Sequence, residues 1–231
     1  MAVEEFNLVL FSGLAADSNV FEAQRTYFEL HGHQVHIVPW LEPLPREGLD
    51  EYAGRLISDY SQLPNLVLGG ASFGGVVAQH AASHAPARGL ILIGSVRQPQ
   101  DLPLFAKLAR PVRWLVRLIP VGMLKLLART ALRFKTWPKS WKHLRPIVDQ
   151  FSDCNSKVFR WSLLQLLTWT EPVKLTIPVF EIHGSRDRAL PLRKTFTGTV
   201  IPDAGHVLSL SHPAEVNQFI EQCLTQLNTR A

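Results

Sequence analysis

The feature that most constrains the fold is a regular alternation of short apolar runs with longer segments of helical apolar spacing. The runs are rich in leucine and β-branched residues, as expected of strands buried on both faces of a parallel sheet. They cover residues 7–11, 34–38, 65–68, 89–93, 179–183 and 197–201. The helical patterns cover residues 19–30, 49–60, 74–84 and 213–227, and Ser211 is expected to cap the last of them, with Pro213 in its first turn. This alternation predicts an α/β fold in which helices flank a mostly parallel central sheet.

The strand signal stops between residues 98 and 172. Leucine, arginine, tryptophan and lysine recur there in helical periods, which prolines interrupt at positions 103, 111, 120, 138 and 146. The strands before and after this segment must pair within one sheet. We therefore expect residues 98–172 to form a helical cap, and residues 1–97 and 173–231 to form the core. A separately folding unit is the alternative.

Length and composition fit a single globular domain. The chain has 231 residues, of which 46% are hydrophobic and 19% charged, so it can bury a full core. Glu4 and Glu5 stand where a secretory signal would carry basic residues, and the apolar stretch 102–132 is interrupted repeatedly by lysine and arginine. We therefore expect a cytoplasmic protein without a membrane span.

A strand, a Gly-x-Ser-x-Gly pentapeptide and a helix follow one another at residues 66–78. A serine on so tight a turn has a strained backbone, and the residues two positions away on each side must lack Cβ atoms. Gly70 and Gly74 meet that condition, so Ser72 is the candidate nucleophile. The pentapeptide alone would arise by chance in roughly 5% of chains with this much glycine and serine. A glycine-rich turn that cradles phosphate is the alternative, although the usual dinucleotide and P-loop patterns do not occur here.

A serine hydroxyl needs a base beside it, and the base needs a carboxylate to orient it. Asp187 follows the run 179–183, and His206 follows the run 197–201. Loops at the carboxyl ends of parallel strands converge on one edge of the sheet, so we expect Asp187 and His206 to meet Ser72 there. Three other acids could replace Asp187 in this role: Asp153, Glu171 and Asp203.

With serine, aspartate and histidine in this order, the sequence resembles the α/β-hydrolase superfamily, in its small, lidded, esterase-like branch. The resemblance covers nearly the whole chain and implies the α/β-hydrolase fold with residues 98–172 as the cap. It also implies an oxyanion hole formed by the backbone N–H groups of Leu14 and Phe73. Members of the family usually carry His-Gly after the first strand, whereas this chain has Ser12 before its glycine. The interval from residue 187 to residue 206 is short for the family, which implies a truncated helix between them.

The resemblance implies acyl transfer to water. His206 would take the proton of Ser72, whose oxygen would attack a carbonyl, and water would release the acyl-enzyme without a metal or cofactor. A carboxylic ester ranks first as the substrate, and an acyl thioester second. Serine at the elbow argues against dehalogenase or epoxide hydrolase chemistry, which needs a carboxylate nucleophile. The alternative from another class is a homologue that binds a ligand in its lidded pocket without turnover.

The remaining histidines are expected to be structural. They are His31, His33 and His36 near one strand, His80 and His84 on one helix face, and His183 within a strand. The first three have no carboxylate or cysteine at ligand spacing, so we expect solvated side chains. The helix pair has a spacing compatible with a metal but more typical of a surface, and the strand histidine is expected to be a hydrogen-bonded core residue. Cys154 and Cys223 show neither metal-ligand nor disulfide spacing and are expected to be reduced.

Positive charge is concentrated in the expected cap. Between Arg97 and Arg145 there are twelve lysines and arginines and a single acid, Asp101, so this segment carries +11. The whole chain carries +5, which leaves −6 for the remainder. Solvated charges on a cap over the active site are one explanation. The excess is larger than solubility requires, so an anionic partner is the other.

Three anionic partners fit this charge: an acidic acyl carrier protein, a coenzyme A thioester and an anionic membrane surface. Arg110, Arg113 and Arg117 are the candidate contacts. Nucleic acid is not expected, because no recognised binding motif accompanies the basic residues. The sequence leaves the oligomeric state open.

Overall fold

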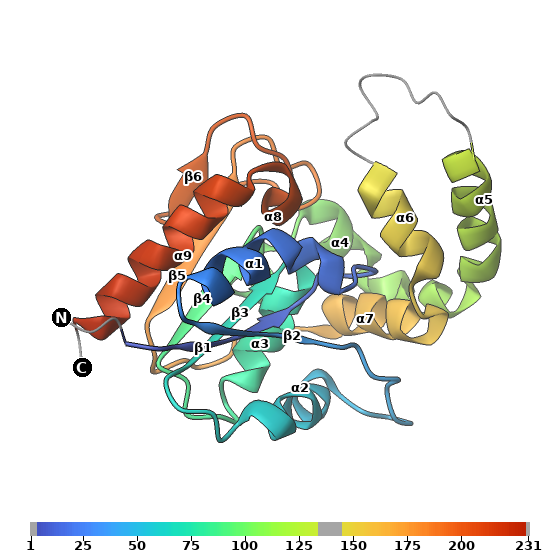
Figure 1. Ribbon diagram of the computed structural model, residues 1–231. Helices are drawn as coiled ribbons and strands as arrows, with labels where there is room; N and C mark the ends of the chain where they lie inside the picture. The colour runs from blue at the N-terminus through green and yellow to red at the C-terminus, as the bar shows by residue number, and fades with distance from the viewer. Residues whose placement is uncertain (1–3, 134–144, 230–231) are drawn as a thin grey trace.

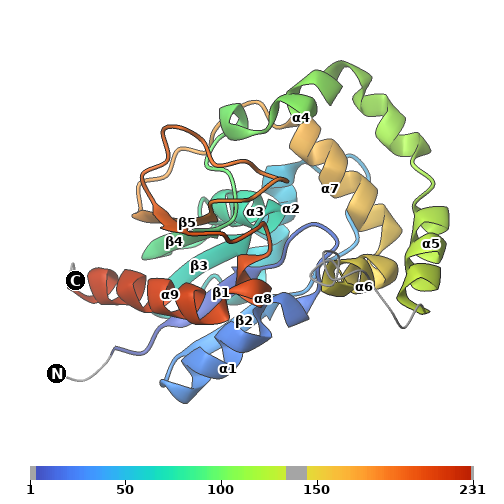
Figure 2. The ribbon, with the colours of Figure 1, turned by 90° about the horizontal axis from the view of Figure 1, so that it is seen from above.

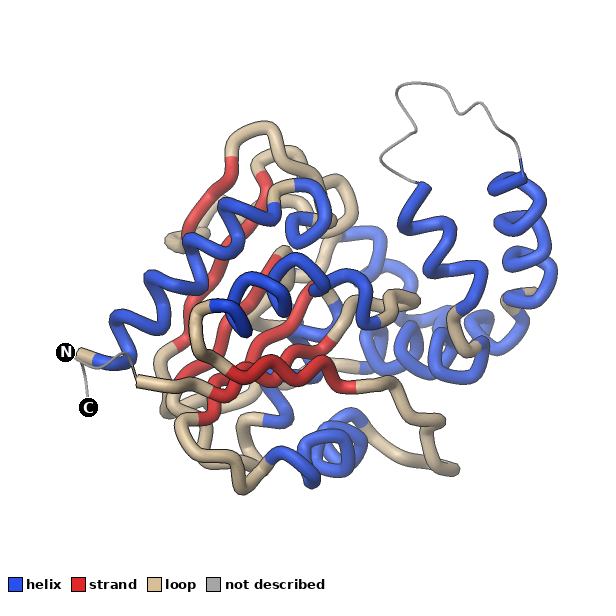
Figure 3. The backbone as a smooth tube through the Cα atoms, viewed as in Figure 1, coloured by secondary structure: helices blue, strands red, loops and turns tan. Residues whose placement is uncertain are grey.

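The computed structural model describes residues 4–133 and 145–229. Pro138 and the lysines at positions 135, 139 and 142, which entered the predictions above, lie outside the described residues. A six-stranded sheet runs through the molecule, with helices on both of its faces (Figures 1 and 3). The strands are β1 (Asn7–Phe11), β2 (Gln34–Val38), β3 (Leu66–Ala71), β4 (Gly89–Ile93), β5 (Val179–Gly184) and β6 (Thr199–Ile201). All neighbouring pairs are parallel, so the prediction of a parallel sheet is confirmed.

The helices around the sheet follow the predicted patterns with one error. They are α1 (Glu22–Leu30), α2 (Leu49–Ile57), α3 (Phe73–Ala81), α8 (Leu208–Ser211) and α9 (Pro213–Asn228), with short 3-10 helices η1 (Ser18–Phe21) and η2 (Ser58–Tyr60). The prediction that Ser211 caps α9 is wrong. Its hydroxyl, at the end of α8, instead donates to the carbonyl of Val207, which precedes that helix, and His212 is the residue before α9. In the described segment 185–198, between β5 and β6, the chain forms no helix, in agreement with the expected truncation.

The order of the strands brings two loops together at one edge of the sheet. The order is β2-β1-β3-β4-β5-β6, so β1 lies between β2 and β3, and the strand order reverses at this point. In α/β sheets, the carboxyl end of such a switch point is where ligands bind. Phe11 pairs with Gly70 at the ends of β1 and β3. The loop after β1 therefore lies beside the turn that carries Ser72.

Apolar side chains cover both faces of the sheet, which explains why the strand sequences are almost continuously hydrophobic. On one face, Val9 and Leu68 belong to a buried cluster with Tyr52 of α2. On the other face, Leu8 packs in a second cluster with helices α1 and α9, which includes Ile220. Figure 2 shows α2 and α3 on one side of the strands and α1 and α9 on the opposite side. The two clusters make the sheet a rigid support for its edge loops.

Among the described residues, six helical elements lie between β4 and β5, and we call this segment the cap. They are η3 (Pro99–Asp101), α4 (Leu104–Ala109), η4 (Arg110–Leu118), α5 (Val121–Arg133), α6 (Arg145–Asp153) and α7 (Ser156–Thr168). Pro103 directly precedes α4, Pro111 lies in the first turn of η4, and Pro120 directly precedes α5, so these prolines begin helices here. Trp161 of α7 packs against the core, whereas α5 lies on the far side of α6 and α7 from the sheet (Figures 1 and 2). None of the described helices is long and apolar enough to cross a membrane.

Candidate active site

Ser72 lies on a strained turn between β3 and α3. Its backbone has φ 52° and ψ −121°, a left-handed conformation that costs a non-glycine residue of order 1–3 kcal/mol. Its N–H donates to the carbonyl of Ile93 at 3.1 Å, which ties the turn to β4. A Cβ added at Gly70 would overlap the backbone of Gly74, and one added at Gly74 would overlap the carbonyl of Phe11. Glycine at both positions therefore lets the chain hold Ser72 above the end of the sheet.

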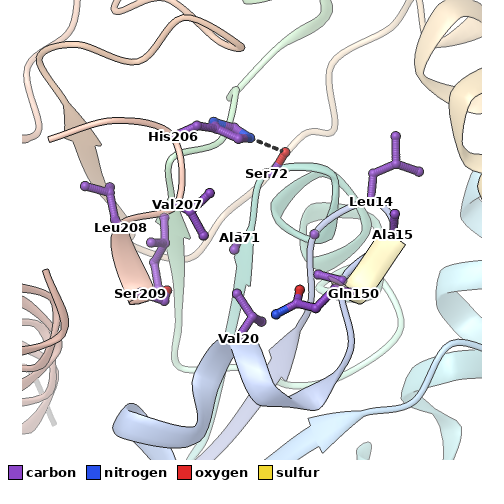
Figure 4. A pocket seen from close by; sticks show the side chains of 13 residues that line it. Leu14, Ala15, Val20, Ala71, Ser72, Gln150, His206, Val207, Leu208 and Ser209 are labelled. Atoms are coloured by element: carbon purple, nitrogen blue, oxygen red, sulfur yellow. Dashed lines mark hydrogen bonds between the residues drawn. The ribbon is translucent and has the colours of Figure 1, made fainter. Parts of the chain in front are cut away.

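The three residues predicted to act together lie in hydrogen-bond contact. His206 Nε2 is 2.9 Å from Ser72 Oγ (Figure 4), and on the other side of the ring His206 Nδ1 is 2.7 Å from Asp187 Oδ2. An ionised carboxylate only accepts hydrogen bonds, so Nδ1 carries the proton and Nε2 is left to accept from the Ser72 hydroxyl. The tautomer that this geometry requires is the one that a general base needs.

Asp187 is buried and remains ionised. Its Oδ1 accepts hydrogen bonds of 2.8 Å from the N–H groups of Ala189 and Leu190. Burial by itself would raise the pKa of Asp187, but hydrogen bonds from His183 and His206 outweigh it and hold that pKa well below its ordinary value. The charge is therefore present to orient His206 throughout the neutral range.

The three alternative acids lie elsewhere. Asp203 pairs with Arg186 at the surface, and Asp153 pairs with Arg129 in the cap. Glu171 is exposed in the segment that follows α7. None of the three contacts His206 among the described residues.

His183 contacts Asp187 from the end of β5. Its Nε2 is 2.7 Å from the carbonyl of Leu190 and 3.2 Å from Asp187 Oδ2. Both neighbours are acceptors, so Nε2 carries a proton that it donates to them. His183 is a buried, hydrogen-bonded residue, as expected, but its contact with the acid was not anticipated. The only indication of this contact in the sequence is that His183 and Asp187 are four residues apart, on either side of the end of a strand.

A buried ion-pair network holds the loop that carries Asp187. Both oxygens of Glu181, on β5, lie 2.8 Å from Arg193 Nη2, and Arg193 Nη1 lies 3.1 Å from Asp101. The side chains of Glu181 and Asp101 are only 7% and 9% exposed. The loop 185–198 thus attaches to the sheet through Arg193.

The backbone of the loop after β1 is positioned beside Ser72. Ser12 Oγ donates to the carbonyl of Asp17 at 2.8 Å, and Ala15 has a φ of 62°, so the loop is a closed turn. A Cβ added at Gly13 would lie 3.5 Å from the Cβ of Ser72, which shows how closely the two segments approach. Leu14 follows Gly13, and Phe73 is the first residue of α3. Among the described residues, neither N–H of this pair has an acceptor, so both remain available to a ligand.

A small, largely apolar cavity of about 100 Å³ opens beside Ser72 (Figure 4). Its walls include Leu14, Val20, Ile93, Gln150, Leu208 and Ser209. Gln150 belongs to α6, so the cap contributes to the cavity, whereas the other walls come from the core. The cavity has room for a short aliphatic group next to the Ser72 hydroxyl.

The prediction for the first three histidines is wrong at one position. His31 is exposed and His36 is half-buried, but His33 is buried and its Nδ1 accepts a hydrogen bond from the N–H of Phe6. The turn after α1 folds beneath the start of β1, where solvent does not reach. Burial lowers the pKa of His33, since the charged ring would be desolvated.

The remaining candidates form no metal site within the described part of the chain. His80 Nδ1 and His84 Nε2 both contact the carboxylate of Asp50, at 3.3 and 3.2 Å. No group of three or more histidine, cysteine, aspartate or glutamate residues is arranged there to hold a metal. Cys154 and Cys223 are unpaired thiols, and burial raises the pKa of Cys223.

The fold and the sequence together place the chain in a family. A sequence model described as the alpha/beta hydrolase family matches residues 8–219. The chain belongs to the alpha/beta hydrolase family, and the predicted fold class is confirmed.

Solved structures of similar fold include two esterases and an enol-lactonase. An esterase from Thermogutta terrifontis has 22% identity and a TM-score of 0.70, over 96% of this chain and 90% of that one. An esterase from Exiguobacterium antarcticum has 19% identity and a TM-score of 0.68, over 97% and 93%. An enol-lactonase from Burkholderia xenovorans has 15% identity and a TM-score of 0.70, over 96% and 92%. No curated protein sequence matches the chain.

Proposed function

We propose that the protein is a serine hydrolase that cleaves a carboxylic ester through an acyl-enzyme on Ser72. The observation that carries this proposal is the continuous hydrogen-bonded chain from Asp187 through His206 to the Ser72 hydroxyl. Membership of the alpha/beta hydrolase family supports hydrolysis, and the esterases and the lactonase of similar fold favour an ester.

Groups at the carboxyl edge of the sheet can carry out each step of ester hydrolysis. His206 Nε2 removes the proton of Ser72 as its oxygen attacks the carbonyl carbon, and Asp187 stabilises the resulting imidazolium. The N–H groups of Leu14 and Phe73 donate to the developing oxyanion. His206 then protonates the leaving alcohol, and water, activated by the same base, hydrolyses the acyl-enzyme and restores the Ser72 hydroxyl.

The cavity beside Ser72 favours a short chain on one side of the ester. A space of about 100 Å³ holds a few carbon atoms, and its apolar walls gain from burying them at roughly 0.8 kcal/mol per methylene. We expect p-nitrophenyl acetate and butyrate to be cleaved with a higher kcat/KM than the decanoate. The acyl thioester of the same chain length is the second substrate class to compare.

Labelling with a fluorophosphonate probe tests the proposal. This reagent modifies a serine only when a neighbouring base activates it, so the parent protein should be labelled stoichiometrically at Ser72. The Ser72→Ala variant should remain unlabelled, whereas the exposed control Ser83→Ala should be labelled like the parent. A folded parent protein that remains inert to the probe and to every ester and thioester would favour a ligand-binding homologue instead.

A further inference from the structure

The outer part of the cap exposes an unusual number of large apolar side chains. We call residues 104–133, which form α4, η4 and α5, the outer cap surface. Of the sixteen exposed large hydrophobic residues in the described chain, eleven lie here. They are Leu104, Phe105, Leu108, Val112, Trp114, Leu115, Leu118, Met123, Leu124, Leu126 and Leu127. Apolar side chains gathered in this way mark a surface that contacts something other than water.

The same surface carries seven basic residues and no acid. They are Lys107, Arg110, Arg113, Arg117, Lys125, Arg129 and Arg133. Arg110 is half-buried and donates to the carbonyl of Trp169 at 2.9 Å, so it holds the cap together and is not a free contact for a partner. Arg113 and Arg117 are exposed. They lie in η4 among the exposed apolar residues Trp114 and Leu118.

We propose that the outer cap surface docks on an anionic lipid bilayer. Leucine, phenylalanine and tryptophan side chains can insert at the boundary between headgroups and acyl chains, while lysine and arginine remain among the lipid phosphates. Each basic residue near an anionic leaflet adds to the attraction. Exposed apolar and basic residues that alternate along three consecutive helical elements fit such a surface.

Charge and composition disfavour two other occupants. A symmetric dimer would bring the basic residues of one copy against those of the other. Residues 104–133 hold no acid to offset the repulsion, and the neighbouring Asp153 of α6 is already paired with Arg129. An acidic protein would offer the right charge. Leucine, however, makes up seven of the eleven exposed apolar residues, and it is under-represented among the residues that carry the binding energy of protein interfaces. A bilayer binds an extended leucine-rich surface without requiring a complementary shape.

The position of the surface would relate the bilayer to the cavity beside Ser72. Helix α5 packs against α6, and α6 supplies Gln150 to the wall of that cavity. Docking through α4, η4 and α5 would therefore hold the cavity one helix layer away from the lipid. The proposal goes beyond ester hydrolysis, and binding can be measured without any turnover.

Flotation with lipid vesicles tests the proposal. The Ser72→Ala protein is used so that no lipid is hydrolysed. It should bind vesicles containing phosphatidylglycerol at least tenfold more tightly than pure phosphatidylcholine vesicles, and raising the salt concentration should weaken the binding. Equal binding to the two kinds of vesicle, or no binding to either, would overturn the proposal.

Paired variants locate the binding. Arg113→Gln with Arg117→Gln should weaken binding to the anionic vesicles by roughly fivefold for each charge, whereas Lys174→Gln with Lys194→Gln should not. Phe105→Ser with Trp114→Ser should weaken it at least tenfold, whereas Leu30→Ser with Leu44→Ser, also exposed, should not. Losses as large in the control pairs would contradict the assignment to the outer cap surface. A stable homodimer that Trp114→Ser dissociates would assign the surface to a second copy.

Discussion

The carboxyl edge of the sheet and the outer cap surface differ in which side chains they bury and which they expose. At the sheet edge, charged groups such as Asp187 and Glu181 are buried, and each has well-placed partners. On the outer cap surface, large apolar groups such as Phe105 and Trp114 are exposed beside basic residues with no acid among them. The first arrangement fixes atoms for chemistry, because a buried charge is tolerated only with accurate geometry. The second arrangement, in our proposal, is stabilised by contact with a lipid bilayer.

This contrast also separates what each region contributes to function. The sheet holds the loops that carry the groups around Ser72, so each of these groups has defined hydrogen-bond partners. The cap contributes a wall of the cavity and, in our proposal, contact with a bilayer. Substitutions at the sheet edge should therefore lower turnover or stability. Substitutions on the outer cap surface should change neither the stability of the protein nor its turnover of a small dissolved ester.

Asp187→Asn should have the largest effect on turnover. The amide removes the charge and can donate where Asp187 only accepts, so His206 loses its tautomer and orientation, and kcat should fall on the order of 10⁴-fold. Steady-state hydrolysis of a p-nitrophenyl ester measures the change. Asp203→Asn is the matched control and should be almost unaffected. If the control loses activity and Asp187→Asn keeps it, the orienting acid comes from another loop.

Arg193→Gln should have a smaller effect, on stability. It leaves the buried carboxylates of Glu181 and Asp101 without their main partner, and the free energy of unfolding should fall by about 3 kcal/mol. Arg186→Gln breaks an exposed ion pair and should change it by less than about 0.5 kcal/mol. Urea unfolding measures both variants. Equal, small effects would show that the loop 185–198 does not depend on the buried network.

His33 should make the core sensitive to mild acid. Burial lowers the pKa of His33 in the folded protein below the value of 6.5 in the unfolded chain. The contribution of the neutral ring to stability is therefore complete above pH 6.5, and it is lost as the pH falls toward the lower pKa of the folded state. Urea unfolding between about pH 7.5 and about pH 5 should show the parent losing stability relative to His33→Gln, which cannot titrate. Parallel pH curves for the two proteins would mean that His33 is solvated after all.

The smallest effect concerns the outer cap surface. Arg113→Gln with Arg117→Gln should leave kcat/KM for a short neutral ester within about twofold of the parent, because exposed charges away from the cavity do not act on a neutral substrate. Initial rates at low and high salt measure this. A large loss with the neutral ester would place these arginines in the active site and remove the contrast between the two regions.

Much of the core could be predicted because local and long-range preferences agree there. The six apolar runs form six parallel strands. The Gly-x-Ser-x-Gly motif forms a tight turn in which a Cβ at Gly70 or Gly74 would overlap backbone atoms. Asp187 and His206 could be proposed from loop position alone, since parallel strands deliver their loops to one edge.

The failures have a common physical cause. Solvent exposure at His33, the cap of α9 and the inward turn of Arg110 depend on which distant backbone approaches the residue. Periodicity does not carry that information. The contact between His183 and Asp187 and the Arg193 network likewise depend on the path of the loop 185–198. Local spacing alone could not supply these contacts.

The most direct test of the central proposal is the turnover of Ser72→Ala with a p-nitrophenyl ester of short chain length. The variant removes only the hydroxyl that His206 contacts at 2.9 Å, and its fold should remain intact by circular dichroism and urea unfolding. We predict that kcat falls by roughly 10⁴-fold or more. A folded Ser72→Ala protein that keeps most of its esterase activity would contradict the account.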